Sequence, residues 1–495
     1  MLPLLQKASE FERRMAVVSD GRSYTYNELL AGARQVATHL LGSSNDLKEA
    51  PVAFLVPPSY EYTAVAWGIW AAGGIAIPLC MLHPLPSLQY VIEDTGARTL
   101  VVHPDYEGLL RPLEKTLGVR LLRVHELFRG PAATLPGIGR ERRAMILYTS
   151  GTTSKPKGVV TTHANIQAQI EVLVKAWEWE KDDYILNILP LHHVHGIINV
   201  MSCALWSGAC CEFMPKFDAG AVWGAIRAGR LSLFMAVPTI YYKLIEYWEA
   251  APETDKNVLS EAGKKLRLMV SGSAALPVPV MEKWQRITGQ TLLERYGMTE
   301  IGMALSNPYR GERRPGHVGQ PLPGVALRLA DSSGNPVKGG APGEIQVKGP
   351  SVFKEYWQKE AATKAAFTAD GWFRTGDIAQ WDEGSYKILG RDSVDIIKSG
   401  GYKISALEIE DVLRKHPDVL DCAVVGLPDE AWGEIVAAFL VSRKEVIPSE
   451  SLSEWVKNYL PAYKVPRRYQ LVDELPRNVL GKVTKNTLKE SPSPS

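Results

Sequence analysis

A group of hydroxyl and lysine side chains follows a short apolar segment in the first third of the chain. Between Tyr148 and Gly158 there are five Ser or Thr residues and two Lys residues. Hydroxyls and backbone N–H groups bind phosphate oxygens, and lysine neutralises their charge. A Walker loop would need glycine five positions after Gly151, where Pro156 stands, so that loop type is excluded. The segment predicts another kind of phosphate loop, with a solvated Ser/Thr turn as the alternative.

Two further segments combine residues that suit a nucleotide. In the sequence Tyr296-Gly-Met-Thr-Glu300, the threonine offers a hydroxyl to a phosphate and the glutamate a hard oxygen to Mg²⁺. Asp377 follows a glycine turn and can accept hydrogen bonds from both ribose hydroxyls. Arg391 lies fourteen residues later and can add a donor to the same sugar. Taken singly, Asp377 could equally be a helix-capping residue and Arg391 a surface residue.

Three imidazoles stand within four residues at His192, His193 and His195. In an extended segment, His193 and His195 would share a face. They could hold zinc, but no cysteine or acidic residue stands at ligand spacing. A turn with packed rings and the wall of a substrate pocket are the other two interpretations.

The elements that must position these residues are visible as short apolar runs. Runs at 52–56, 99–102, 145–148, 231–237 and 266–270 are rich in aliphatic residues and separated by helical patterns. Strands spaced by helices predict parallel sheets with crossover helices. No internal repeat is visible.

The pattern changes twice further along the chain. Residues 316–390 contain short strands with glycine-rich turns, which is closer to a β-barrel. After Arg391 a helix at 406–414 and strands at 419–425 and 435–441 indicate a separate α+β unit of about 100 residues. We therefore expect a large domain over residues 1–392 and a small one over 393–495.

Composition limits the function classes. The 495 residues carry a net charge of +2, which gives no overall field for nucleic acid or an anionic membrane. Five cysteines without a CxxC motif fit a reducing compartment. The stretch 62–92 has no charged residue, but Gly73-Gly74 and Pro78 interrupt it, so a buried helix is expected rather than a membrane span. The N-terminus does not resemble a secretory signal. We expect a cytoplasmic protein, or a mitochondrial matrix protein if a leader has been removed.

From residue 145 to residue 482, these motifs stand in the order found in the adenylate-forming superfamily, which includes acyl-CoA synthetases, luciferases and peptide-synthetase adenylation domains. The segment Thr149 to Lys157 resembles its phosphate loop, although Ser154 replaces the usual glycine. The resemblance implies an α/β fold with two stacked α/β subdomains plus a β-barrel, and a small mobile α+β C-terminal domain. It implies binding of ATP by Thr149, Ser150, Gly151, Thr152, Thr153, Ser154, Lys155, Pro156, Lys157, Ser273, Ala274, Ala275, Tyr296, Gly297, Met298, Thr299, Asp377, Arg391 and Lys482.

The same resemblance implies a two-step reaction with ATP, Mg²⁺ and coenzyme A. Lys482 matches the lysine of the first half-reaction, Thr299 contacts the adenylate phosphate, Glu300 binds magnesium and His193 lies near the reacting carboxylate. The CoA tunnel is implied for Ser399, Gly400, Gly401 and Tyr402. The hinge between the two domains falls on Ser393, where the family usually carries Asp or Lys.

The acid is suggested by Arg295, because a guanidinium in an apolar pocket is costly unless an anion accompanies it. Segments 189–196, 294–308 and 318–323 resemble malonyl-CoA synthetases, so we expect malonate, with methylmalonate as a second substrate. The acid-binding residues expected are Arg295, His195, Ser271 and Met303. A structural pair between Arg295 and Glu294 is the alternative reading of the arginine.

Rival functions remain open at this stage. They are a medium-chain or aromatic acyl-CoA synthetase, in which Arg295 points away from the pocket, and a non-catalytic nucleotide-binding module. A peptide-synthetase adenylation domain is less favoured because no carrier domain follows residue 495. The expected partners are a dicarboxylic acid, ATP and CoA, without nucleic acid or a membrane span, in a monomer or weak homo-oligomer.

Overall fold

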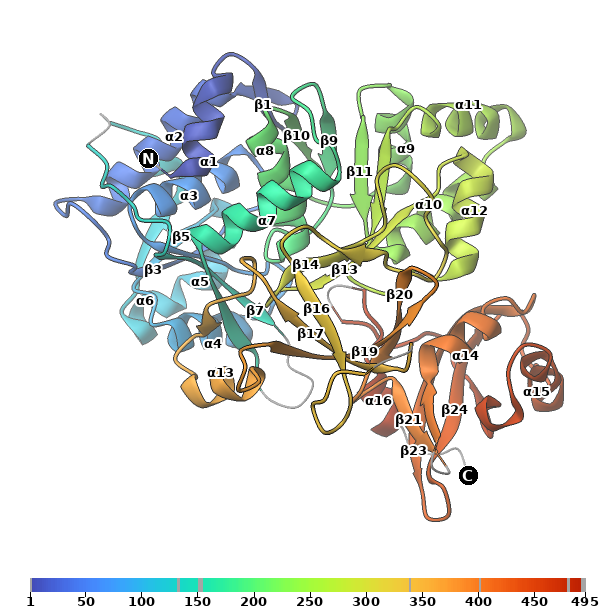
Figure 1. Cartoon of the computed structure of the whole chain (residues 1–495). Coiled ribbons are helices and arrows are strands. Elements are labelled where there is room, and N and C mark those ends of the chain that lie inside the picture. Colours follow the sequence, from blue (N-terminus) through green and yellow to red (C-terminus); the bar gives the residue numbers. More distant parts are fainter. Residues whose placement is uncertain are drawn as a thin grey trace.

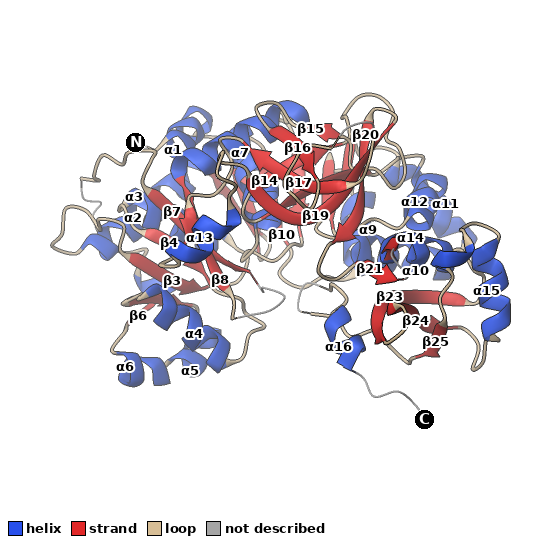
Figure 2. Ribbon diagram, turned by 60° about the horizontal axis from the view of Figure 1, so that its bottom comes forward, coloured by secondary structure: helices blue, strands red, loops and turns tan. Residues whose placement is uncertain are grey.

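The computed structural model describes residues 2–130, 134–149, 155–337, 340–399, 402–478 and 481–490 (Figures 1 and 2). Seven of the expected site residues lie outside the described residues: Ser150, Gly151, Thr152, Thr153, Ser154, Gly400 and Gly401.

The first layer is a seven-stranded sheet with the order β18-β8-β7-β4-β3-β5-β6. Its inner strands pair in parallel, whereas β7, β8 and β18 form an antiparallel edge. The strands are β3 (Pro51–Leu55), β4 (Ile75–Pro78), β5 (Thr99–Val102), β6 (Arg120–Arg123), β7 (Arg143–Thr149), β8 (Lys157–Thr162) and β18 (Glu355–Tyr356). The helices of this part are α1 (Pro3–Ala8), α2 (Tyr26–Leu41), α3 (Tyr60–Ala71), α4 (Leu85–Thr95), α5 (Pro104–Leu110), α6 (Pro112–Leu117) and α7 (His163–Ala176).

The charge-free stretch near the start of the chain forms α3 and β4. Nearly every side chain of α3 is buried, because the helix is apolar on all sides and α2 packs along it. In the described part of the chain, no helix is long and apolar enough to cross a membrane.

The second layer is a nine-stranded sheet with the order β15-β14-β13-β12-β11-β9-β10-β1-β2. Its strands are β1 (Met15–Ser19), β2 (Arg22–Thr25), β9 (Tyr184–Asn187), β10 (Cys210–Phe213), β11 (Leu233–Ala236), β12 (Leu268–Ser271), β13 (Leu293–Met298), β14 (Gly302–Ser306) and β15 (Gln320–Pro321). Its helices are α8 (Cys203–Ser207), α9 (Ala219–Arg227), α10 (Pro238–Ala250), α11 (Glu253–Gly263) and α12 (Val278–Thr288). In Figure 1 the green strands and helices of this layer, from β9 to α10, lie beside the blue and cyan first layer.

The segment expected to be barrel-like forms a four-stranded antiparallel sheet with the order β16-β17-β19-β20. It comprises β16 (Ala326–Ala330), β17 (Gly343–Lys348), β19 (Phe373–Asp382) and β20 (Ser385–Arg391), with α13 (Glu360–Ala366) inserted. Figure 2 shows it above the C-terminal unit.

The C-terminal unit has a sheet and a core of its own. Its strands are β21 (Ile396–Ser399), β22 (Tyr402–Ser405), β23 (Val419–Asp429), β24 (Gly433–Ser442) and β25 (Arg468–Leu471), and its helices are α14 (Ala406–Leu413), α15 (Ser449–Lys457) and α16 (Lys485–Glu490). Ile404, Ile409, Val424 and Leu440 are among the buried residues that join the helices to the sheet. A separate core is what an independently moving unit requires.

Candidate active site

The predicted phosphate loop joins two paired strands. β7 and β8 form an antiparallel hairpin in which Thr149 lies opposite Lys157. The Tyr90 hydroxyl donates to the Pro156 carbonyl at 2.9 Å, and Lys155 Nζ lies 5.5 Å from the centre of the Tyr90 ring. Both lysines of the motif therefore lie at the end of the hairpin where the loop joins β7 to β8.

The turn between β13 and β14 carries Thr299 and Glu300. Glu300 is buried, and its Oε1 accepts a hydrogen bond from the Tyr356 hydroxyl at 3.0 Å. Burial raises the pKa of this carboxyl. The positive charge of Arg391 lowers the pKa of this carboxyl, and the negative charge of Asp377 raises it. A buried carboxylate beside a phosphate loop suits Mg²⁺, which binds through one or two carboxylates plus substrate phosphates. The residues present therefore fit the ion.

The expected ribose pair is brought together by strand register. Asp377 on β19 lies opposite Arg391 on β20, and Arg391 Nε is 3.1 Å from Asp377 Oδ1. The Tyr296 hydroxyl donates to the other carboxylate oxygen at 2.6 Å. Arg391 also donates to the Thr375 carbonyl at 3.2 Å. Three separated parts of the sequence thus meet at one carboxylate.

Lys482 approaches the same region from the C-terminal unit. Its backbone N–H donates to Asn478 Oδ1 at 3.0 Å. Solvent reaches the side chain, yet protein surrounds it closely enough that desolvation lowers its pKa. The charges of Arg391 and Arg295 lower it further, whereas Asp377 raises it. The lysine therefore lies near both the Asp377–Arg391 pair and Arg295.

The segment after β12 carries three of the residues expected to bind ATP, Ser273, Ala274 and Ala275. Ser271 ends the strand with its hydroxyl buried and unpartnered in the described structure. Ser273 adopts a φ of +71°, a strained conformation for a residue other than glycine. Ala274 and Ala275 are exposed, as side chains beside a ligand would be.

Arg295 is buried, and nothing in the described part of the chain forms an ion pair with it. Its Nη2 lies 3.4 Å from Ser273 Oγ, and its Nε has no hydrogen-bond partner among the described residues. Glu294 instead accepts from the Leu276 N–H at 2.9 Å. Burial lowers the pKa of Arg295 to about 10 and raises that of Glu294 to about 8. The described structure therefore has no direct ion pair between Arg295 and Glu294, although the charge of each residue acts on the pKa of the other.

The histidine segment is not extended, so the expected strand-like sharing of a face by His193 and His195 is wrong. The chain turns at His193 and enters a π-helix over His195–Ser202, a form that is frequent at functional sites. His195 Nδ1 lies 3.1 Å from the same Ser273 Oγ that Arg295 faces. Burial holds the pKa of His193 and His195 well below the ordinary value, so both rings are neutral. Among the described residues, no group of three or more His, Cys, Asp or Glu side chains is placed to hold a metal ion.

Of the remaining expected residues, two lie on β13 and β14 and two lie in the sheet of the C-terminal unit. Met303 is buried on β14 near Gly297, and Met298 ends β13. Ser399 is buried at the end of β21, whereas Tyr402 is exposed and stacks on Tyr463 with ring centres 4.4 Å apart.

The turn that follows β20 contains the expected hinge. Ser393 is exposed, and Val394 and Asp395 both donate their N–H to the Arg391 carbonyl, at 3.0 and 2.8 Å. Asp395 Oδ2 accepts from the Arg391 N–H at 3.0 Å, and Asp395 Oδ1 accepts from Lys485 at 2.6 Å. The backbone of Arg391 is therefore part of the turn that leads into the C-terminal unit.

Comparison with known proteins agrees with this arrangement. Residues 4–357 match the family model described as AMP-binding enzyme, and residues 408–482 match the AMP-binding enzyme C-terminal domain. The chain belongs to the AMP-binding enzyme family. It is 44% identical to the mitochondrial malonate–CoA ligase of Bos taurus over 98% of this chain and 89% of that protein. It is 40% identical to the malonate–CoA ligase of Arabidopsis thaliana over 98% and 87%.

Solved structures resemble this AMP-binding enzyme over its whole length. ATP-bound MatB from Rhodopseudomonas palustris is 33% identical with a TM-score of 0.91, and the match covers 99% of each chain. O-succinylbenzoate coenzyme A synthetase from Bacillus subtilis, solved with ATP and a magnesium ion, is 29% identical with a TM-score of 0.85 over 99% of each chain. The expected superfamily and fold class are confirmed.

Sequence reasoning missed two residues that hold the site of this AMP-binding enzyme together. Tyr356 binds Glu300, as described above. Gln169 on α7 accepts from the Met303 N–H at 2.5 Å, close to the Thr299–Glu300 turn. In the sequence, an aromatic residue in a short strand and a glutamine in a helix are typical of ordinary packing, so neither pattern could have identified them.

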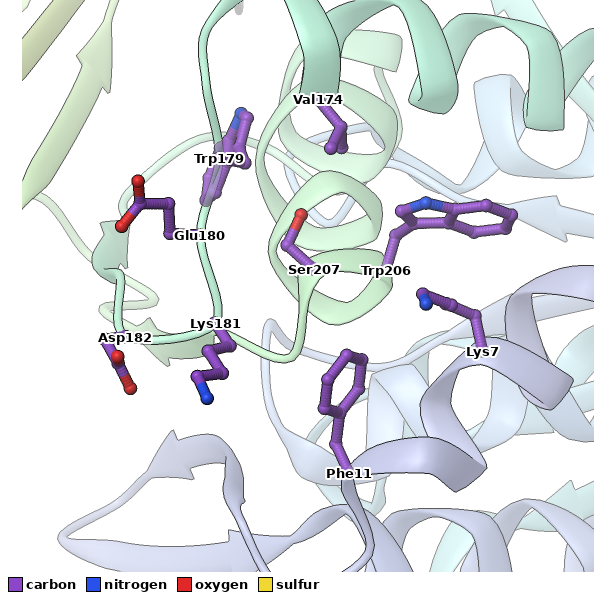
Figure 3. A pocket seen from close by; sticks show the side chains of 9 residues that line it. All are labelled: Lys7, Phe11, Val174, Trp179, Glu180, Lys181, Asp182, Trp206 and Ser207. Atoms are coloured by element: carbon purple, nitrogen blue, oxygen red, sulfur yellow. The ribbon is translucent and has the colours of Figure 1, made fainter.

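A surface hollow of about 470 Å³ lies elsewhere (Figure 3). It shares no residue with the site, since it is lined by Lys7, Phe11, Val174, Trp179, Glu180, Lys181, Asp182, Trp206 and Ser207.

Proposed function

We propose that this chain is an ATP-dependent acid–thiol ligase that converts malonate and CoA into malonyl-CoA, AMP and pyrophosphate through an acyl-adenylate. The observation that carries the choice of acid is Arg295. A buried guanidinium without an ion pair, facing Ser273 and His195, is stabilised by a bound anion. The second carboxylate of malonate supplies that anion, and arginine can bind it through two parallel hydrogen bonds.

In the first step, an oxygen of the other carboxylate attacks the α-phosphorus of ATP and pyrophosphate leaves. Asp377 and Arg391 hold the ribose, while Lys157 and the loop hydroxyls hold phosphate oxygens. Thr299 contacts the α-phosphate and Lys482 neutralises charge that develops on the reacting oxygens. Neutral His193 orients the attacking carboxylate without adding a competing charge. Catalysis is then mainly positioning and charge neutralisation. Mg²⁺ bound at Glu300 would neutralise phosphate charge.

In the second step, the thiolate of CoA attacks the acyl carbon and AMP leaves. Lys482 then has to withdraw, because it stands where the thiol approaches. We place the domain boundary after Asp392 and assign the rotation to Ser393, which is exposed in the linking turn. Ser399 and Tyr402 are proposed to border the pantetheine path. We also propose the expected ATP-binding contacts of Ser150 to Ser154, together with Gly400 and Gly401 on the CoA side.

The acid pocket is proposed to be formed by Arg295, His195, Ser271 and Met303. Methylmalonate differs from malonate by one methyl group, which a pocket discriminates by only about 1–3 kcal/mol. We therefore expect it to be a second, slower substrate.

The test is pyrophosphate release, with and without CoA, across malonate, methylmalonate, propionate, octanoate and coumarate. We expect malonate to have the highest kcat/KM. Arg295→Ala should reduce the malonate value by about 100-fold or more, because a buried charge pair is lost. It should change the propionate value little. Arg310→Ala, which removes an exposed arginine paired with Glu178, is the control.

Two outcomes would favour the rival functions. If octanoate or coumarate exceeds malonate, the protein is a medium-chain or aromatic acyl-CoA synthetase. If no acid releases pyrophosphate, it is a nucleotide-binding module without catalysis.

We propose a reducing compartment for this protein, since all five cysteines are free and buried. The Bos taurus relative is named as mitochondrial, which favours the matrix alternative over the cytoplasm. We propose a monomer or weak homo-oligomer, to be checked by light scattering.

A further inference from the structure

Tyr356 lies between two side chains that carry charge in the proposed reaction. Its hydroxyl donates to Glu300 Oε1 at 3.0 Å. Lys157 Nζ lies 5.1 Å from the centre of its ring, within the range of a cation–π contact. One side chain thus contacts both the proposed magnesium ligand and the proposed phosphate-loop lysine.

The backbone around Tyr356 is fixed to both of these neighbours. β18 pairs with β8, with Tyr356 opposite Val159. The Trp357 N–H donates to the Gly158 carbonyl at 2.8 Å, one residue after Lys157. On the other side, the Phe353 N–H donates to the Glu300 carbonyl at 2.7 Å. Residues 353–357 therefore link the phosphate-loop hairpin to the turn that carries Glu300.

The Tyr356 side chain has little freedom to move away. It is buried, and its ring packs edge-on against Phe353 with centres 4.8 Å apart. A phenol held in this way fixes the direction from which its hydroxyl reaches the carboxylate. Groups that orient a metal-binding carboxylate by hydrogen bonding typically change metal affinity by about 10–100-fold when they are removed.

We propose that Tyr356 is a positioning residue: its hydroxyl holds one oxygen of Glu300 so that the other stays available to the magnesium ion that accompanies ATP, and its ring keeps the Lys157 ammonium beside the phosphates. This rests on the proposed ATP site, because both partners belong to it. The metal-binding role of the hydroxyl and the lysine-holding role of the ring are separable by mutation.

The experiment measures ATP binding to the full chain by calorimetry, without acid or CoA, in EDTA and across a Mg²⁺ titration. Tyr356→Phe removes the hydroxyl and keeps the ring. We expect the Mg²⁺ concentration at half-maximal ATP binding to rise about ten-fold. ATP affinity in EDTA should stay within about two-fold of wild type, since the hydroxyl acts only through Glu300. Tyr356→Leu should weaken ATP binding in EDTA as well.

The matched control is Tyr184→Phe. It removes the hydroxyl of a tyrosine on β9 that donates to Glu212 on β10 at 2.7 Å. It should leave the Mg²⁺ dependence unchanged. A double-variant cycle with Glu300→Gln gives a second test. We expect the double variant Glu300→Gln/Tyr356→Phe to have the same Mg²⁺ dependence as Glu300→Gln alone, because the hydroxyl then has no carboxylate to hold.

Several results would overturn the proposal. One is that Tyr356→Phe keeps the Mg²⁺ dependence of the wild type. Another is that Tyr356→Phe loses the same ATP affinity with and without Mg²⁺. A third is that the effects of Glu300→Gln and Tyr356→Phe on the Mg²⁺ dependence add in the double variant. A Tyr356→Phe variant that fails to fold while Tyr184→Phe folds would make the position merely structural. If the wild-type protein binds no ATP at all, the proposed function itself fails. Loss of malonate preference alone leaves this test intact, because no acid is present.

Discussion

Gly272 is the residue whose backbone lies against the Arg295 guanidinium. A Cβ at this position would stand 2.5 Å from Arg295 Cζ, which no real contact allows. We expect Gly272→Ala to displace the guanidinium and raise the malonate KM by on the order of 10–100-fold. The KM for ATP should change little, and steady-state kinetics with each substrate varied in turn would measure both. Equal increases in the two KM values would contradict this role.

His163 provides a residue-scale prediction for acid stability. Burial, and secondarily Arg142, lower the pKa of this imidazole from 6.5 to about 4. Because the unfolded chain binds the proton more readily, stability is lost as pH falls from about 6.5 to about 4. His163→Gln should remove about 2 kcal/mol of the stability change between pH 7.5 and pH 5. Urea unfolding of both proteins at pH 7.5 and pH 5 would measure it. A pH dependence that is the same in both proteins would count against the prediction.

At the scale of elements, Lys482 reaches from the C-terminal unit to the large domain. Lys482 lies close enough that its charge lowers the pKa of His193, and a Cβ at Gly481 would lie 3.4 Å from Thr239 Oγ1 on α10. We expect Lys482→Ala to reduce adenylate formation by about 100-fold or more. Thioester formation from supplied malonyl-adenylate should be spared. Single-turnover assays of the two half-reactions separate the effects, and equal loss of both would contradict the assignment.

The regular elements were well predicted because each depends on a local pattern. The apolar runs became β3, β5, β7, β11 and β12, since buried parallel strands are continuous apolar segments. The pairing of Asp377 with Arg391 could be expected from residue types and order. The π-helix could not, because nothing in the sequence of His195–Ser202 distinguishes a π-helix from an α-helix. The roles of Tyr356 and Gln169 could not be predicted either, because their contacts join segments that are far apart in the sequence.

At the scale of the whole molecule, Lys485 connects the end of the chain to the hinge. It is buried and lies 2.6 Å from both Asp395 Oδ1 and Glu410 Oε1. We expect Lys485→Met to destabilise the C-terminal unit by about 3–5 kcal/mol, because Asp395 loses its ammonium partner and buried Glu410 keeps Arg414, at 3.4 Å, but loses the nearer cation. Calorimetric unfolding should show a lowered transition for that unit, whereas the exposed Lys457→Met should leave it unchanged. A single unshifted transition in Lys485→Met would contradict the prediction.

Arg391 has a consequence that reaches across the whole molecule. Its side chain binds the Asp377 carboxylate, while its backbone N–H and carbonyl form the turn to Asp395. In the proposed function, nucleotide occupancy and the orientation of the C-terminal unit are therefore linked equilibria that share this residue. Such linkage is reciprocal: if one orientation strengthens nucleotide binding by some factor, the nucleotide favours that orientation by the same factor. The exchange of ATP for AMP during the reaction then serves as the signal that redistributes the two orientations.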